Sequence, residues 1–237
     1  MNGLHAERSE ALDPATCRAI CAALKRSPLV GDNALSPAFT GSSGVQAVFT
    51  REGLNRLHDE LGMLAPAFAC ATSPESNAFF INALIIHDAA RVEAHLDCSL
   101  DTHLGVHTVP RRVCVVYVQV PEDLEGGALE ILEPDGHLHR VHPQIGLLVQ
   151  FRGDLVHGIT AARTSSTRIS VVIEEYVLEP PLLGLVPRFA IGPTPRRGEG
   201  AGAKLAALLG SLSASEREAL RGLGPDELSR LCAGLEE

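Results

Sequence analysis

Short β-rich runs separated by turns fill residues 78–176, and this pattern limits the possible folds more than any other feature of the chain. The runs are AFFINALII, RVEAHLD, RRVCVVYVQV, GALEILE, IGLLVQFRG, LVHGIT and TRISVVIEEYV. The links between them are too short to hold the crossover helices that parallel strands require. We therefore expect antiparallel strands arranged as a sandwich or barrel.

Helices are predicted before this β-rich region. Apolar residues recur at helical spacing from Pro14 to Leu24, and leucines repeat the pattern between Arg51 and Leu64. Between the two helices, residues 45–49 (VQAVF) alternate in the manner of a first strand. We therefore predict a mainly β protein with flanking helices. We expect residues 1–192 to form one domain, with its core at about residues 78–177.

A linker and two short helices are predicted for residues 193–237. The segment GPTPRRGEGAG has the composition of a loop, and Ser213 with Glu216 three residues later forms a capping-box pattern. A second helix is announced by Pro225 and the two acidic residues after it. The apolar faces of these helices could pack on the barrel or on a second subunit, so a homodimer through them is one possibility.

Charge and hydropathy exclude two classes of partner. The formal net charge of −9 is spread along the chain without a run of Lys or Arg, so we expect no nucleic acid as a partner. The longest apolar runs, at residues 78–86 and 113–120, are shorter than the roughly 20 residues that span a bilayer. The first fourteen residues lack the basic start and apolar core of a signal peptide, which predicts a cytoplasmic protein.

The chain contains six cysteines, none with the two-residue spacing of a zinc knuckle or a redox pair. We expect free thiols. Cys17 and Cys21 are four residues apart in a predicted helix, and a shared buried face explains them better than a metal site does.

Three residues form a candidate metal site. Side chains two apart on a strand project to the same face, so His95 and Asp97 can converge on one ion. His157 follows a turn at the start of another strand and is the candidate third ligand. Two imidazoles and one carboxylate suit non-haem iron(II) and leave coordination positions open. A His-x-Asp triplet alone is weak evidence, because such triplets also occur as surface pairs.

Arg168 strengthens this interpretation. It opens the apolar strand RISVVI, where an unpaired charge is costly, so it needs an anion. A guanidinium grips a carboxylate through two parallel hydrogen bonds, and Ser170 on the same strand face can add its hydroxyl. The other interpretation is a structural salt bridge to an acidic side chain.

Together these pieces resemble the 2-oxoglutarate and iron(II)-dependent oxygenase superfamily, in its prolyl-4-hydroxylase-like branch. The resemblance covers residues 79–176 and rests on the order and separation of four motifs. They are His95-x-Asp97, RRVCVVYVQV followed by EGGAL, GLLVQFRGDLVHGI, and Arg168-x-Ser170. It implies a double-stranded β-helix, the jelly-roll fold that cupins also have, for residues 1–192.

The resemblance also implies roles for individual residues. His95, Asp97 and His157 would be the iron ligands, and Arg168 would bind the distal carboxylate of 2-oxoglutarate. Tyr117 matches a tyrosine that often binds the same carboxylate, although it could instead be a core tyrosine. Gly126 and Gly127 match paired glycines that permit a tight turn, and Leu129 would be an apolar wall facing the co-substrate.

The implied activity is oxidation of an unactivated carbon with O2 and 2-oxoglutarate, releasing succinate and CO2, with ascorbate as a possible stimulant. We expect hydroxylation of a small metabolite, such as an amino acid or a natural-product intermediate. The alternatives are a protein or peptidyl hydroxylase, a cupin-like metalloenzyme that does not use 2-oxoglutarate, and an inactive scaffold. Asp97 argues against halogenases, which carry a small residue at this position.

The remaining polar residues carry weaker predictions. Substrate choice should depend on the loops at residues 30–44, 65–77 and 98–112. The histidines around the turn at residues 134–136 are expected to be exposed on a hairpin: His137, His139 and His142. The sequence assigns no role to four others, which could contact substrate or lie elsewhere: His87, His103, His107 and Arg112.

Overall fold

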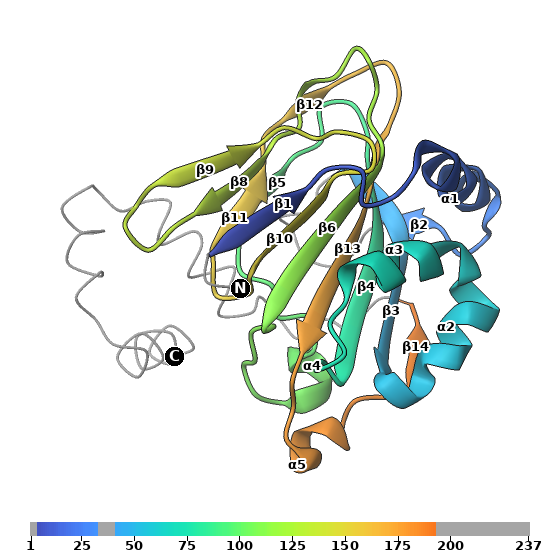
Figure 1. The fold of residues 1–237 in the computed structure, drawn as a ribbon, viewed down its shortest axis with the longest axis vertical. Coiled ribbons are helices and arrows are strands. Elements are labelled where there is room, and N and C mark those ends of the chain that lie inside the picture. Colours follow the sequence, from blue (N-terminus) through green and yellow to red (C-terminus); the bar gives the residue numbers. More distant parts are fainter. Residues whose placement is uncertain (1–3, 33–40, 193–237) are drawn as a thin grey trace.

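Antiparallel sheets dominate the computed structural model, which describes residues 4–32 and 41–192 (Figure 1). The strands of the larger sheet follow one another in space in the order β1 (His5–Arg8), β10 (Leu148–Arg152), β6 (Arg112–Gln119), β13 (Arg168–Tyr176), β4 (Ala78–Ile86), β3 (Ser42–Thr50) and β14 (Phe189–Ile191). A further short strand, β2 (Gly31–Asp32), also pairs with β3. The smaller sheet has the order β5 (Val92–His95), β11 (His157–Ile159), β8 (Leu129–Leu132), β9 (Leu138–Val141). A short ladder joins β7 (Glu125–Gly126) to β12 (Ala162–Arg163). The predicted antiparallel architecture is confirmed.

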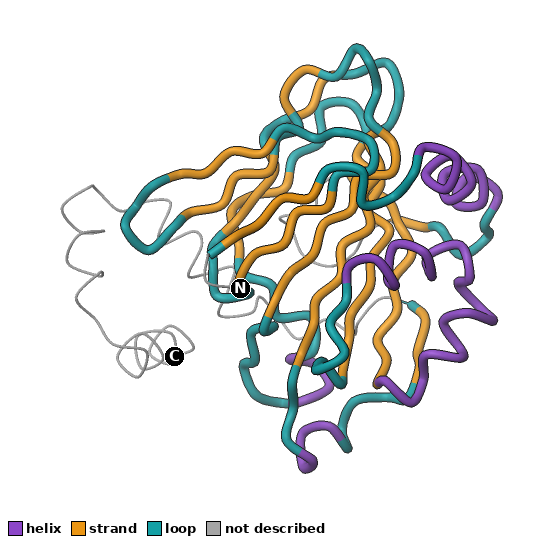
Figure 2. The backbone as a smooth tube through the Cα atoms, in the orientation of Figure 1, coloured by secondary structure: helices purple, strands orange, loops and turns teal. Residues whose placement is uncertain are grey.

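The two sheets form a jelly-roll sandwich (Figure 2). Buried side chains join them. Tyr117 and Val149 of the larger sheet pack in one apolar cluster with Leu129, Ile131 and Val141 of the smaller sheet. The alternation of each strand places these residues on the inner faces and leaves the opposite face of the larger sheet for the helices.

Three helices cover the outer face of the larger sheet: α1 (Pro14–Arg26), α2 (Leu54–Leu61) and α3 (Ala65–Ala71). Helix α1 begins where the Asp13 carboxylate accepts hydrogen bonds from the backbone N–H groups of Ala15 and Thr16, at 2.9 and 3.0 Å. Its buried stripe contains Cys17 and Cys21, as predicted. Two further helices are short, α4 (Asp101–Leu104) and α5 (Pro180–Leu183).

The helix expected between Arg51 and Leu64 is present, but it is not α-helical over its whole length. Only α2 is α-helical, and 3-10 turns flank it at Arg51–Gly53 and Gly62–Leu64. The expected loop at residues 65–77 is wrong in its first half, because α3 occupies it and buries Phe68 in the helix-covered core. The apolar spacing was correct, but glycines at both ends of α2 interrupt the regular helix.

Several expectations concern residues outside the described ranges. These are the linker and two helices of residues 193–237, the homodimer through them, Cys232, and most of the loop at residues 30–44. The five cysteines within the described ranges are free thiols: Cys17, Cys21, Cys70, Cys98 and Cys114. Among the described helices, none has the length and apolar character needed to cross a membrane.

Candidate metal centre and anion pocket

His95, Asp97 and His157 meet on the inner side of the smaller sheet. Strands β5 and β11 pair with His157 directly opposite His95, and Asp97 lies two residues beyond the end of β5. The Nε2 atoms of His95 and His157 lie 3.3 and 3.4 Å from the two carboxylate oxygens of Asp97. One potential ligand atom from each residue lies within 4.8 Å of the others. The structure thus brings the predicted triad together.

Backbone carbonyls orient both imidazoles toward the centre of the triad. The Nδ1 atom of His95 lies 2.8 Å from the carbonyl oxygen of Glu93, and that of His157 lies 3.0 Å from the carbonyl oxygen of Leu155. A proton on each Nδ1 would be donated to the carbonyl, which leaves the Nε2 lone pair for an ion. Metal-binding histidines are commonly held in this way.

The electrostatics of the triad keep Asp97 ionised. Burial raises the pKa of Asp97, but the charge and hydrogen bonds of His157 and His95 outweigh burial and hold the pKa below its usual value. Burial lowers the pKa of His95, but the hydrogen bond and charge of Asp97 reverse this and raise it. A carboxylate between two imidazoles is therefore a ready anionic ligand.

Gly158 permits the close approach of β11 to β5. A Cβ atom at this position would lie 2.9 Å from the carbonyl oxygen of Val92 and 3.1 Å from the amide nitrogen of Ala94, both rigid backbone atoms. A larger residue would therefore push β11 away from β5 and separate His157 from His95.

A second polar group lies at the start of β13. Arg168 and Ser170 share the inner face of β13, and Tyr117 on β6 is paired with Ser170. All three side chains are fully buried, and the guanidinium carbon of Arg168 lies 4.9 Å from the centroid of the Tyr117 ring. The structure therefore brings together the three residues that were expected to bind one carboxylate.

This pocket offers hydrogen bonds that the protein does not use. Within the described ranges, all three guanidinium nitrogens of Arg168, the Ser170 hydroxyl and the Tyr117 hydroxyl have no hydrogen-bond partner. No acidic side chain there forms an ion pair with Arg168, which disfavours the structural salt bridge. Burial raises the pKa of Tyr117, opposed by the Arg168 charge, so the phenol stays protonated at neutral pH. The pocket is suited to an anion.

Residues of the smaller sheet and of the preceding turn pack close to this polar group. Leu129 is buried in the same apolar cluster as Tyr117. Gly126 and Gly127 both adopt positive φ angles, of 72° and 63°, which favour glycine. A Cβ atom on Gly127 would lie 3.5 Å from Cδ of Arg168, so the paired glycines bring the turn onto the arginine side chain.

Glu174 is a polar residue of the inner face that the sequence analysis missed. It is buried on β13, and its carboxylate accepts hydrogen bonds from the Ser99 amide at 3.2 Å, the Ser99 hydroxyl at 2.5 Å and the Tyr176 hydroxyl. Burial raises its pKa well above the usual value, and the charge of Asp97 raises it further. The network ties the segment that follows Asp97 to β13. Counting in steps of two from Arg168 would have placed Glu174 on the inner face.

The residues left without a role lie mostly outside this site. Arg112 forms an ion pair with the buried Glu175 on the helix-covered face of the larger sheet. His87 is exposed and contacts the Ser43 hydroxyl at 2.9 Å, and His107 contacts Asp101 at 2.8 Å. His103 is partly buried, and burial lowers its pKa.

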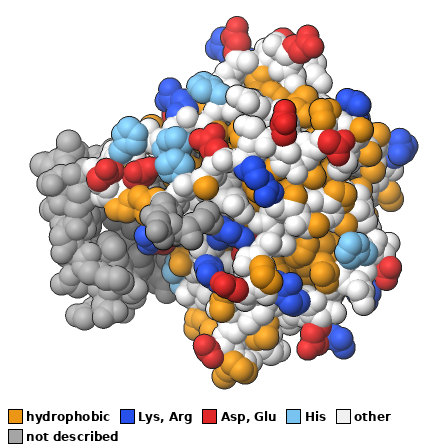
Figure 3. Space-filling model, viewed as in Figure 1, with side chains coloured by type: hydrophobic (Ala, Val, Ile, Leu, Met, Phe, Trp, Pro, Cys, Tyr) orange, Lys and Arg blue, Asp and Glu red, His pale blue; other side chains and the backbone are white. Residues whose placement is uncertain are grey.

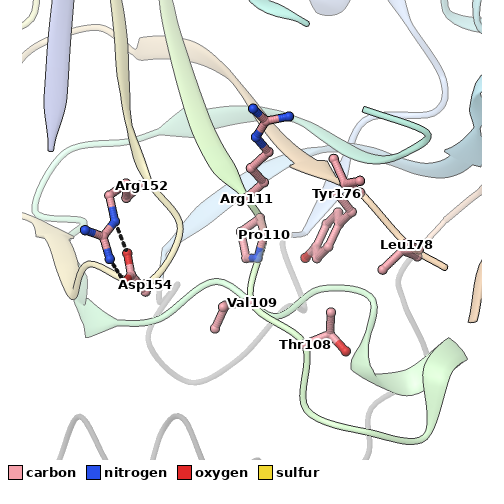
Figure 4. A pocket seen from close by; sticks show the side chains of 9 residues that line it. Thr108, Val109, Pro110, Arg111, Arg152, Asp154, Tyr176 and Leu178 are labelled. Carbon is pink, nitrogen blue, oxygen red and sulfur yellow. Dashed lines mark hydrogen bonds and ion pairs between the residues drawn. The ribbon is translucent and has the colours of Figure 1, made fainter. Parts of the chain in front are cut away.

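A cavity of about 310 Å³ opens near the end of β13 (Figure 4). Residues 108–111 line its middle, with the ion-paired Arg152 and Asp154 on one side of them and Tyr176 and Leu178 on the other. Part of the loop expected to contact substrate, residues 98–112, therefore lines this cavity. Tyr176 links it to Glu174 and hence to the segment after Asp97.

Comparison with known proteins supports the fold. No protein-family model and no curated protein sequence matches this chain. A prolyl-4-hydroxylase from Pseudomonas putida superimposes with a TM-score of 0.53 at 19% identity, over 75% of this chain and 95% of that chain. A prolyl hydroxylase from Trichoplax adhaerens, solved in complex with a peptide fragment of hypoxia inducible factor, superimposes with a TM-score of 0.52 at 11% identity, over 74% and 84%. The chain therefore has the fold of these two prolyl hydroxylases, and the predicted jelly-roll fold is confirmed.

Proposed function

We propose that this chain is an iron(II)- and 2-oxoglutarate-dependent dioxygenase. His95, Asp97 and His157 would hold the iron, and Arg168 would bind the distal carboxylate of 2-oxoglutarate with help from Tyr117 and Ser170. The observation that carries the proposal is the buried guanidinium of Arg168, which has no hydrogen-bond or ion-pair partner within the described residues. Burial of an unpaired cation is expensive, so an anion that occupies the pocket relieves a cost that the fold has already incurred.

Each group in the site has a defined task. The two imidazoles and the Asp97 carboxylate leave coordination positions open on one ion, as the facial-triad arrangement requires. Arg168 positions the far end of the dicarboxylate, and Leu129 excludes water beside it. When bound, the iron, 2-oxoglutarate and O2 would supply an oxidant that hydroxylates an unactivated carbon, with succinate and CO2 as co-products.

A cupin-like metalloenzyme that does not use 2-oxoglutarate explains the triad equally well. It does not explain why Arg168, Ser170 and Tyr117 converge with unused hydrogen-bonding capacity. An inactive scaffold is disfavoured for the same reason, because a pocket without a function has no need to keep a buried, unpaired charge.

We propose a small metabolite, such as an amino acid or a natural-product intermediate, as the primary substrate. The cavity of about 310 Å³ beside Tyr176 is at the lower end of the range for small-molecule sites. A peptidyl substrate is the second candidate. It is favoured by the similarity to the two prolyl hydroxylases, one of which was solved with a peptide.

The proposal is tested by succinate formation under iron(II), ascorbate and 2-oxoglutarate. Free amino acids and proline-containing peptides would be supplied in parallel, and mass spectrometry would detect the gain of one oxygen atom in the product. Asp97→Ala serves as the inactive control, and His87→Ala as an exposed histidine that should have no effect. Oxidation of free amino acids alone supports the metabolite, oxidation of peptides alone supports the second candidate, and absence of succinate across a broad panel argues against the function itself.

A further inference from the structure

A second group of metal-ligating side chains lies away from the candidate active site. His5 and Glu7 lie on β1, and His139 lies on β9. One potential ligand atom from each of the three lies within 4.8 Å of the others, as in the His95, Asp97 and His157 triad. None of these residues contributes to the active site, so this cluster does not depend on the proposed function.

The cluster bridges the edges of the two sheets. Strand β1 is the terminal strand of the larger sheet, and β9 is the terminal strand of the smaller sheet. Figure 1 shows β1 beside the β8–β9 hairpin, and Figure 3 shows histidine and acidic side chains gathered over this edge. In the described chain β1 pairs with β10 alone and β9 with β8 alone, so the outer edge of each strand is unpaired and side-chain contacts connect the two sheets here.

The contacts within the cluster pair imidazoles with carboxylates. The Nε2 atom of His139 lies 3.1 Å from Glu7 Oε1, and the two histidine rings are stacked with their centroids 3.8 Å apart. Glu133 Oε1 lies 3.2 Å from the Nδ1 atom of His5. That Nδ1 atom is buried and is not aligned for a hydrogen bond with any described residue. The cluster therefore holds a buried nitrogen that is close to a carboxylate but does not hydrogen-bond to it.

We propose that His5, Glu7 and His139 bind a divalent transition-metal ion of the zinc class, which clamps β1 to β9. Two imidazoles and one carboxylate form a ligand set that zinc accepts, with one position left for water. His5 and Glu7 are two apart on a strand and project to one face, the same spacing that His95 and Asp97 use. Once the His5 ring turns, Glu133, whose Oε1 lies 3.2 Å from Nδ1, would accept a hydrogen bond from that nitrogen and act as the outer carboxylate that orients the ring.

Binding requires a local rearrangement. The two rings lie within 26° of parallel, so they must turn apart before both can point at one ion. The side chains of His5 and His139 are 24% and 26% exposed, which leaves space for this rotation. The rotation replaces a ring stack by two metal–nitrogen bonds and leaves the strands in place.

Zinc stoichiometry of the chelator-treated full chain tests the site without any activity measurement. After incubation with excess Zn²⁺ and removal of free metal, wild type should retain two ions per chain by elemental analysis. His157→Ala should retain one, His139→Ala should retain one, and the double variant should retain none. His137→Ala is the matched control, because His137 is an exposed histidine on the same hairpin, and it should retain two. Circular dichroism confirms that each variant is folded.

Two conservative variants distinguish loss of zinc binding from loss of the fold. Glu133→Gln should weaken zinc binding in the His157→Ala background by about ten- to a hundredfold, as loss of an outer carboxylate does. Glu7→Gln, which keeps the shape of a side chain that is 40% exposed, should weaken it further. A His157→Ala protein that binds no zinc would overturn the proposal. Zinc that persists in the double variant would also overturn it, and would direct attention to Cys98, Asp101 and His107, which form another candidate group.

Discussion

The guanidinium of Arg168 lies over the ring of Tyr117, 4.9 Å from its centroid, and neither polar group has a hydrogen-bond partner in the described chain. A desolvated cation–π contact contributes about 2 kcal/mol. The penalty for burying a charge is several kcal/mol, so Tyr117 offsets only part of it. An anionic ligand that pairs with Arg168 would offset the rest of this penalty, which favours its binding.

Removal of the Arg168 guanidinium should abolish tight binding of 2-oxoglutarate. Arg168→Ala leaves the distal carboxylate buried without its partner, a loss of about 3–5 kcal/mol. At about 1.4 kcal/mol per factor of ten, this weakens binding roughly a hundredfold to several thousandfold. Arg168→Lys should recover only part of the affinity, because an ammonium keeps the charge and loses the planar fork. Calorimetry under argon measures the dissociation constants of 2-oxoglutarate and of iron(II) for wild type and both variants.

Iron affinity is the internal control for these variants. Arg168 is not one of the three candidate ligands, so iron binding should hardly change. Unchanged 2-oxoglutarate affinity in Arg168→Ala would remove the co-substrate role and favour a metalloenzyme that does not use 2-oxoglutarate. Loss of iron affinity would instead indicate general damage to the site.

The two hydroxyls should contribute less than the guanidinium. Tyr117→Phe and Ser170→Ala each remove one donor to a carboxylate, and a hydrogen bond to a charged group contributes about 1.5–3 kcal/mol. Each variant should weaken 2-oxoglutarate binding by about ten- to a hundredfold. Thermal stability without ligand should not fall by a comparable amount, since neither hydroxyl has a described partner to lose. If Tyr117→Phe binds 2-oxoglutarate as tightly as wild type, Tyr117 is a core tyrosine that does not contact the co-substrate.

Each metal ligand should be essential for iron binding and dispensable for the fold. His95→Ala, Asp97→Ala and His157→Ala should abolish succinate formation and the visible charge-transfer band of the anaerobic iron and 2-oxoglutarate complex. The apolar clusters that stabilise the sandwich do not include these residues. Circular dichroism should therefore stay close to that of wild type. A variant with full turnover would exclude its residue from the triad.

The sequence predicted the parts of the fold that depend on local spacing. Alternation identified the antiparallel strands, and an arginine at the start of an apolar strand drew attention to the buried group of Arg168, Ser170 and Tyr117. The helix at residues 51–64 was predicted, but apolar spacing does not show that it changes to a 3-10 turn at Gly62. His137 and His142 are exposed as expected, whereas His139 is half-buried against β1. Glu7 and His139 are 132 residues apart, and no local pattern brings such residues together.

Glu174 and Glu175 show that local sequence also fails to distinguish the roles of two neighbouring residues. They are adjacent, chemically equal and both buried, yet they point to opposite faces of β13. Glu174 accepts hydrogen bonds from Ser99 and Tyr176 on the side of the candidate metal centre. Glu175 accepts hydrogen bonds from Arg112 and Ser76 on the helix-covered face. Only the pairing of β13 with its neighbours decides which of the two serves the site.

This pair provides a matched test of how the metal centre is held. Glu174→Ala removes the acceptor that fixes the segment after Asp97, so iron affinity should fall by about ten- to a hundredfold, as for other outer partners of metal ligands. Glu174→Gln keeps one acceptor and should restore most of that affinity. Glu175→Gln weakens a buried pair with Arg112, so it should lower the melting temperature and leave iron affinity unchanged. Iron titration and thermal melting of the three variants separate positioning from stability. Equal loss of iron affinity in Glu174→Ala and Glu175→Gln would mean that both residues act only through the fold.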